Sequence, residues 1–347
     1  MAELSDERVE GGSVKAVVLE GRNRITVRDV PRPGAGGKAV VQVERAGLCG
    51  TDLKILSGAI ATRPPLVLGH EVVGRVVRPG PRGLVAEGER VLVDPGVACG
   101  RCVECRNDRT HLCPNGGLLG RDADGGLAEY LEVDEGQLHP LPPGIGPDAE
   151  AVLQVLATCV HGQTRVQVFP GQPAVVVGLG VSGLLHTQLL LLRGAHPVIG
   201  VTRSETKRAR ARDFGAHHTV APEEAPDAVR ELTGGRGADI VVESVGSAEA
   251  LRQSSILAAP GGSVLVFGTT APTADGVPTY EWYFRELGIV NTRGARPRDF
   301  ARAIELTAAG MLRLTSMVTS SYRLEDAAEA FAACGRPDEL KVVLDVA

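Results

Sequence analysis

The sequence predicts an α/β protein with one β-rich domain and one domain built on a doubly wound parallel sheet. Three observations support this fold class. From Val14 to about Gly144, short apolar runs are separated by Gly and Pro. Near Asp148 the pattern changes to strands that alternate with helices. The run VVVGLGVSG then places glycines where such a strand meets such a helix, which is typical of parallel α/β folds.

The first region reads as strands and tight turns without long helices. Its apolar runs are KAVVLE, KAVVQVERAG, VVGRVVRPG and ERVLVDPG. Each run is short enough for a strand and is bounded by turn-forming residues.

The second region alternates strand and helix with short links. Ala174–Val177 is a buried strand that ends in glycine, and the next segment, VSGLLHTQLLLLRG, is a helix closed by Gly194. PVIGV is a further strand, ETKRARARDFG a helix that ends at Gly215, and ADIVVESVG and GGSVLVFG supply later strands. This alternation predicts a parallel, doubly wound sheet.

Composition narrows the class of protein. The 347 residues are 43% hydrophobic and 23% charged, which is ordinary for a globular protein large enough for two domains. A formal net charge of -5 argues against a nucleic-acid partner. No apolar run approaches the roughly 20 residues of a membrane span. Because MAELSDERVEGG resembles no export signal, we expect a cytoplasmic protein with reduced cysteines.

Four cysteines lie close together in the run ACGRCVECRNDRTHLC, as Cys99, Cys102, Cys105 and Cys113. Thiolates two residues apart can turn inward on one loop, and four of them complete a tetrahedral zinc shell. The alternative, two disulfides, requires an oxidising compartment. We therefore expect a structural zinc, which leaves no open position for a substrate.

A glycine motif predicts a dinucleotide site. Gly178 allows a tight turn, Gly180 lets the backbone approach a pyrophosphate, and Gly183 lets the helix pack on the strand. The helix N-terminus offers free N–H groups to the phosphates.

The end of the next strand indicates the preferred cofactor. NAD enzymes usually carry an acidic residue here, but this chain has Thr202, followed by Arg203 and, one helical turn later, Lys207. A hydroxyl and a guanidinium suit a 2′-phosphate, so we expect NADP to be preferred over NAD. The alternative is that Arg203 is only solvated and that the enzyme binds NAD without its usual anchor.

These motifs, in this order, carry a family resemblance over nearly the whole chain. Upstream of the four cysteines lie AGLCGTDLK, with Cys49 and Thr51, and PPLVLGHEVVG, with His70 and Glu71; GRDADGGLAEYLEV follows them. The chain resembles the zinc-dependent medium-chain alcohol dehydrogenases, and most closely their polyol and threonine dehydrogenase branch.

The resemblance implies a division into domains and a cofactor site. It implies a discontinuous, GroES-like catalytic domain over 1–152 and 297–347, and a Rossmann domain over 153–296. It extends the predicted dinucleotide site to Val181, Ser182, Gly246, Phe267 and Gly268. It also implies a homodimer or homotetramer.

The resemblance further implies a catalytic zinc beside the structural one. Cys49 and His70 match two of its ligands, and Glu71 can reach the metal in the resembled enzymes. Where the family often has a ligating Glu, this chain has Gln154, in the run QVLATCVH. We expect Cys49, His70 and Glu71 as ligands, with Gln154 near the metal or bonded through its water.

Three neighbouring residues complete the expected site. Asp52 would hold the second nitrogen of His70, and the Thr51 hydroxyl would sit beside the substrate oxygen and pass a proton outward. Lys54 either ends this proton relay or is a surface cation.

The predicted activity is reversible hydride transfer between an alcohol (a polyol, a cyclitol or a secondary alcohol) and NADP or NAD. Two alternatives are reduction of an activated carbon–carbon double bond on the same fold and a non-catalytic nucleotide-binding role. The aromatic run Tyr280–Phe284 could line a pocket, a subunit contact or the core.

Overall fold

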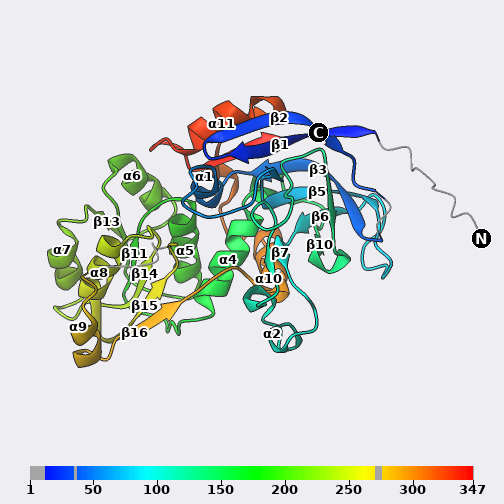
Figure 1. Ribbon diagram of the computed structural model, residues 1–347. Coiled ribbons are helices and arrows are strands. Elements are labelled where there is room, and N and C mark those ends of the chain that lie inside the picture. Colours follow the sequence, from blue (N-terminus) through cyan, green and yellow to red (C-terminus); the bar gives the residue numbers. More distant parts are fainter. Residues whose placement is uncertain (1–11, 35–36, 270–275, 347) are drawn as a thin grey trace, which may run out of the picture. The chain divides into compact units, whose positions relative to one another are not determined.

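The structure, a computed structural model, describes residues 12–34, 37–269 and 276–346 (Figure 1). The chain divides into two compact units, Met1–Gln154 with Leu314–Ala347, and Val155–Arg313. By these contacts the chain returns to the first unit at Leu314, later than the expected boundary at 297. Helix α10 (Pro297–Ala308) stays with the second unit, where its Asp299 pairs with His161 at 2.9 Å.

The first unit is β-rich, as expected. Its strands before the four-cysteine lobe (residues 99–113) are β1 (Ser13–Gly21), β2 (Arg24–Pro31), β3 (Ala39–Gly47), β4 (Leu66–Val67), β5 (Glu71–Arg78), β6 (Arg90–Val93) and β7 (Gly96–Val97). They are followed by β8 (Gly117–Leu118), β9 (Tyr130–Val133), β10 (Leu138–Pro140), β17 (Val318–Arg323) and β18 (Lys341–Asp345). Its helices are short: α1 (Gly50–Leu56), α2 (Val103–Arg106), α3 (Pro147–Glu150), α11 (Ala327–Cys334), and the 3₁₀ turns η1 (Thr110–Leu112), η2 (Glu135–Gln137), η3 (Thr315–Met317) and η4 (Leu324–Asp326).

The main sheet of this unit joins distant parts of the chain. Its strand order is β10-β6-β5-β3-β18-β17, with β9 also paired to β3. The C-terminal strand β18 pairs antiparallel with β3, so that Val343 lies opposite Gly47. This pairing brings the end of the chain beside the segments that carry Cys49 and His70.

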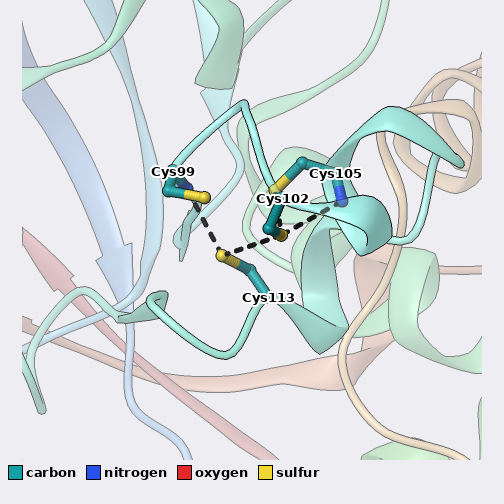
Figure 2. A group of neighbouring side chains, drawn as sticks. All are labelled: Cys99, Cys102, Cys105 and Cys113. Carbon is teal, nitrogen blue, oxygen red and sulfur yellow. Dashed lines mark hydrogen bonds between the residues drawn. The ribbon is translucent and has the colours of Figure 1, made fainter.

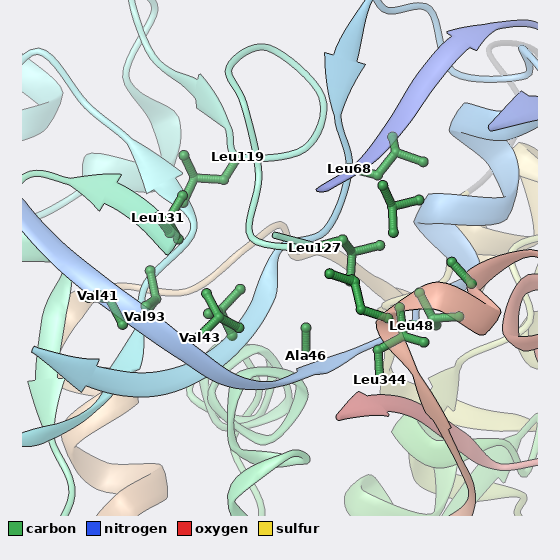
Figure 3. Packing of buried hydrophobic residues seen from close by; sticks show 14 of the residues in the cluster. Val41, Val43, Ala46, Leu48, Leu68, Val93, Leu119, Leu127, Leu131 and Leu344 are labelled. Atoms are coloured by element: carbon green, nitrogen blue, oxygen red, sulfur yellow. The ribbon is translucent and has the colours of Figure 1, made fainter. Parts of the chain in front are cut away.

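A hydrophobic core stabilises the first unit. Val41, Val43 and Ala46 of β3 pack with Leu68, Leu127 and Leu344, and all are at most 3% exposed (Figure 3). Burying a large apolar side chain contributes roughly 1.5–3 kcal/mol. This core holds the loops of the site on a rigid support.

The second unit contains six parallel strands in the order β13-β12-β11-β14-β15-β16. They are β11 (Ala174–Val177), β12 (Val198–Val201), β13 (His218–Val220), β14 (Ala238–Glu243), β15 (Ala258–Val266) and β16 (Gly288–Asn291). The helices are α4 (Leu153–Gln163), which starts at the boundary, α5 (Val181–Leu192), α6 (Glu205–Asp213), α7 (Ala225–Leu232), α8 (Ala248–Leu257), α9 (Thr279–Phe284) and α10.

Helices cover the parallel sheet of the second unit. Helix α8 packs on β14 and β15, and α5 packs on β11 and β12. All four residues of β11 are buried, as expected for a central parallel strand covered on both faces. The predicted doubly wound sheet is confirmed. In the described ranges no helix is both long and apolar enough to cross a membrane.

Candidate functional site

The four-cysteine lobe brings its thiols together (Figure 2). Cys102 caps α2, Cys113 follows η1, and all four sulfur atoms lie within 4.8 Å of one another. The Cys102 Sγ atom lies 3.5 Å from Cys105 Sγ and 3.8 Å from Cys113 Sγ. Zinc–sulfur bonds of about 2.3 Å in a tetrahedron place the sulfurs roughly 3.8 Å apart, whereas a disulfide requires about 2.05 Å. The lobe therefore fits zinc. None of the seven cysteines of the chain forms a disulfide.

The thiols of the lobe differ in acidity. Backbone N–H groups of Arg101 and Cys102 lower the pKa of Cys99 to about 6. Burial and the neighbouring thiols raise the pKa of Cys105 to about 12. Four thiolates this close repel one another, so full ionisation requires a cation among them.

A second group joins the start of α1 to the start of β5. Donor atoms of Cys49, His70 and Glu71 all lie within 4.8 Å of one another. Cys49 precedes α1, and its backbone N–H donates to Asp52 Oδ2 at 2.9 Å. A thiol, an imidazole and a carboxylate at this spacing are a donor set that suits zinc.

Asp52 orients His70 from behind. Its Oδ1 lies 3.2 Å from His70 Nδ1, within ion-pair distance, although the geometry is not that of a good hydrogen bond. Burial lowers the pKa of His70, but Asp52 and Cys49 outweigh it and raise this pKa well above its ordinary value. With Nδ1 facing Asp52, Nε2 is the ring nitrogen left for a metal.

Lys341 is a residue of this site that sequence analysis missed. Its ammonium forms an ion pair with Glu71 Oε2 and donates to Leu48 O at 3.2 Å. Lys341 and Glu71 are each 2% exposed. A Cβ on Gly47 would collide with both side chains, so a larger residue there would have to displace the ion pair. The sequence feature that could have indicated this buried charge is a lysine inside the apolar run LKVVLDV.

The remaining predicted residues of this site lie on two helices. Gln154 is in the first turn of α4 and is 8% exposed. Thr51 and Lys54 are half-buried on α1. Cys159, further along α4, is fully buried and donates its thiol to Ser182 O at 3.8 Å.

The glycine motif forms an open turn before α5. Gly178 follows β11 with φ +91°, and Gly183 packs so closely on the Gly178 carbonyl that a Cβ would collide with it. Apart from its two chain neighbours, no described residue has an atom within 4 Å of a Cβ placed on Gly180, the N-cap, and no described side chain caps the helix. Val181 and Ser182 therefore begin a helix whose N-terminal end suits a phosphate.

Thr202 and Arg203 follow β12 in the second unit. The Arg203 side chain is exposed, whereas the Arg208 guanidinium is committed to Thr202 O at 2.8 Å and to Glu205 at 2.6 Å. Lys207 lies in the first turn of α6, with its backbone N–H bonded to the N-cap Ser204 Oγ at 3.3 Å. Within the described residues, the Arg203 guanidinium forms no hydrogen bond or ion pair, so it is available to bind a ligand.

The loops after β14 and β15 bring Gly246 and Gly268 into contact. A Cβ on Gly268 would lie 2.6 Å from Gly246 Cα. Phe267 packs edge-on against His186, with ring centroids 4.6 Å apart. A buried carboxylate beneath these loops, Glu243, was not predicted.

A GroES-like unit with two zinc-type donor clusters and a Rossmann unit with an open phosphate turn define a metal- and dinucleotide-dependent oxidoreductase. Two family models match: the alcohol dehydrogenase GroES-like domain over residues 35–143 and the zinc-binding dehydrogenase domain over 182–309. The chain belongs to the zinc-containing, NAD(P)-dependent alcohol dehydrogenases, and its relatives include sorbitol and L-threonine 3-dehydrogenases.

Individual relatives support this assignment. An uncharacterized zinc-type alcohol dehydrogenase-like protein of Haemophilus influenzae is 30% identical and covers 90% of this chain and 92% of its own length. The L-galactonate-5-dehydrogenase of Escherichia coli is 31% identical, covering 88% and 89%.

Solved structures agree. A structure from Sinorhizobium meliloti, described as a zinc-binding dehydrogenase bound to NADP, is 35% identical with a TM-score of 0.88, and covers 96% of this chain and 99% of its own. An alcohol dehydrogenase from Thermus is 31% identical with a TM-score of 0.88, covering 96% and 100%.

Proposed function

We propose that this enzyme transfers a hydride reversibly between an alcohol (a polyol, a cyclitol or a secondary alcohol) and NADP. The observation that carries the proposal is the Cys49, His70 and Glu71 group, in which His70 and Glu71 are buried and Cys49 is partly buried, with Asp52 behind His70. Zinc held by this group supplies a Lewis acid that lowers the pKa of an alcohol hydroxyl. The nicotinamide, when bound, takes up the hydride.

The chain's own residues hold the metal and move the proton. In this proposal Cys49 and His70 bind the metal throughout the reaction, and Asp52 keeps His70 Nε2 available to the metal. Glu71 Oε1 has no hydrogen-bond partner among the described residues, so this oxygen is the one that can join the shell. Thr51 relays the alcohol proton through its hydroxyl, and Lys54 on the same helix is the candidate for the end of that relay.

Gln154 is proposed to lie near the metal without contributing charge. In Gln154→Glu, an added carboxylate should leave the metal bound or bind it more tightly. Zinc content after mild chelation is the measurement, with the parent as control. A clear loss of zinc from the variant would show that Gln154 does not face the metal.

Metal analysis separates this function from its alternatives. Two zinc ions per chain, one in the lobe and one at Cys49, support the alcohol dehydrogenase. One zinc, together with reduction of an activated double bond or with no turnover at all, supports an alternative. Polyols, aminocyclitols, sugars and simple alcohols should be assayed with both NAD and NADP to find the substrate.

The preference for NADP rests on the end of β12. Thr202 removes the carboxylate that would repel a 2′-phosphate, and Arg203 presents a free planar donor set. Charge-assisted hydrogen bonds contribute about 1.5–3 kcal/mol, or about 10- to 150-fold in affinity. Arg203→Ala should weaken the preference, and Thr202→Asp should reverse it toward NAD. The measurement is kcat/KM with both cofactors; a parent that uses NAD better overturns the proposal.

A homo-oligomer is also proposed. Three of the four aromatic side chains of α9 are not core residues: Tyr280, Tyr283 and Phe284 are 71%, 81% and 72% exposed. Only Trp282 turns inward, donating Nε1–H to Ser255 Oγ at 2.7 Å. Light scattering should give the mass of a dimer or tetramer, and Tyr283→Glu should lower it if this face is the contact.

A further inference from the structure

Glu243 is a fully buried carboxylate at the carboxyl end of the parallel sheet. It is the last residue of β14 and is 0% exposed. In the ladder it lies opposite Val177 of β11 and Val266 of β15, the last residues before the glycine turn and before Phe267. Burying a carboxylate is costly unless it is hydrogen-bonded, so its contacts indicate what it does.

Glu243 binds the two loops that follow β14 and β15. Its Oε1 accepts the N–H groups of Val245 at 2.7 Å and Gly246 at 2.8 Å. Its main-chain oxygen accepts those of Phe267 at 2.9 Å and Gly268 at 3.0 Å. One residue thus holds both loops at the same edge of the sheet.

The loop held by the carboxylate touches the phosphate turn. A Cβ on Gly178 would lie 2.7 Å from Val245 Cγ2, and a Cβ on Gly246 would lie 2.6 Å from Thr269 O. Gly246 also has φ +83°, which favours glycine. Val245 is 52% exposed at the carboxyl edge of the sheet. Close backbone contacts therefore fix the position of the loop, while its apolar Val245 side chain faces outward.

We propose that Glu243 is a positioning residue for the dinucleotide: its carboxylate holds the 244–247 loop in the shape that binds the cofactor, without touching it. This inference rests on the proposed function. A loop that is already ordered loses less entropy on binding, which raises affinity. Without the carboxylate, two backbone N–H groups lose their acceptor and the loop is free to move.

The test is fluorescence titration of the full-length protein with NADPH and NADH. Glu243→Ala should bind the preferred cofactor about 10- to 100-fold more weakly, the range that the loss of one or two such bonds predicts. Glu243→Gln keeps an oxygen acceptor and should stay within about 5-fold of the parent. Glu243→Asp, which keeps the charge but is one methylene shorter, should bind weakly and serves if the alanine variant fails to fold. The matched control is Glu249→Ala, an exposed acidic residue in the first turn of α8.

Hydrogen exchange of the cofactor-free proteins provides the second measurement. Amides of 244–247 and 267–269 should exchange faster in the alanine or aspartate variant and at the parental rate in Glu243→Gln. Weaker thermal stability with unchanged cofactor affinity would show a purely structural role and overturn the inference. A parent that binds neither cofactor would instead overturn the proposed function, and the positioning role with it.

Discussion

At the scale of single residues, the Glu71–Lys341 pair is the dominant electrostatic feature of the candidate metal site. Both charges are buried, and burial lowers the pKa of Lys341, although Glu71 and Cys49 outweigh it and raise this pKa above its ordinary value. Lys341 therefore stays charged, and Glu71 is shared between an ammonium and the position where a metal would bind.

We expect Lys341→Met to be strongly destabilising. It leaves the Glu71 carboxylate buried without its partner, and breaking a buried pair costs about 3–5 kcal/mol. Lys15→Met is the matched control, because the Lys15–Glu325 pair is 49% and 44% exposed and such surface pairs contribute about 0–1 kcal/mol. Denaturant unfolding with zinc analysis is the measurement. Equal effects in the two variants would contradict a buried ion pair.

Asp94 predicts a pH dependence of stability. Burial raises its pKa from 3.8 to about 7, although the Gly96 N–H, at 2.8 Å from Oδ1, opposes this. Between pH 3.8 and about 7, the folded state therefore keeps a proton on Asp94 that the unfolded state has lost. The contribution to stability is full below about pH 3.8 and is lost as the pH rises toward 7.

Asp94→Asn should remove this dependence. The amide keeps an oxygen for Gly96 N–H but carries no charge, so the variant should be more stable than the parent at pH 8, by at most about 4 kcal/mol. The two proteins should converge near pH 4. Thermal unfolding from pH 4 to 8 is the measurement, and parallel curves would refute the assignment.

At the scale of elements, the lobe around α2 and η1 has little apolar packing of its own. None of the residues of α2 or η1 is buried. Its shape therefore depends on the four thiols and their metal, because structural zinc contributes folding free energy directly.

Two cysteine variants should behave differently. Cys102→Ser should lose the lobe zinc and lower stability or solubility, while zinc at Cys49 is retained. Cys49→Ala should retain one zinc per chain, keep its stability and lose turnover. Zinc analysis, thermal unfolding and kcat report the three effects. Parental turnover in Cys49→Ala would refute the catalytic assignment.

At the scale of the whole molecule, the two kinds of site belong to different units. Both cysteine-containing donor clusters lie in the first unit, and the glycine turn with the end of β12 lies in the second. The sites should therefore be separable by chemical treatment.

Mild chelation should abolish turnover and leave NADPH affinity within about 3-fold, because Cys49, His70 and Glu71 belong to the first unit and the glycine turn belongs to the second. Fluorescence titration before and after chelation, with zinc add-back as the control, checks this expectation. Parallel loss of cofactor binding would show that the metal site and the second unit are coupled.

Much of the fold and the site was predictable because it depends on local spacing. The cysteines of the lobe lie on one loop, and the motif from Gly178 to Gly183 lies between one strand and one helix. The strand Ala174–Val177 was predicted with its observed bounds. Where the chain returns to the first unit was less predictable, since contacts such as His161–Asp299 join segments 138 residues apart.

By itself the sequence determined the fold class, the family and the residue types of both donor clusters, because short-range spacing and binary patterning carry that information. Tertiary structure alone decided which charges meet. It placed Lys341 on Glu71, 270 residues away, through the pairing of β18 with β3. It also placed the Glu243 carboxylate beneath two loops and left Tyr280, Tyr283 and Phe284 of α9 exposed. The sequence shows only a charged Lys or Glu inside an apolar run. Its partner could not be predicted, because strand pairing rather than proximity along the chain selects that partner.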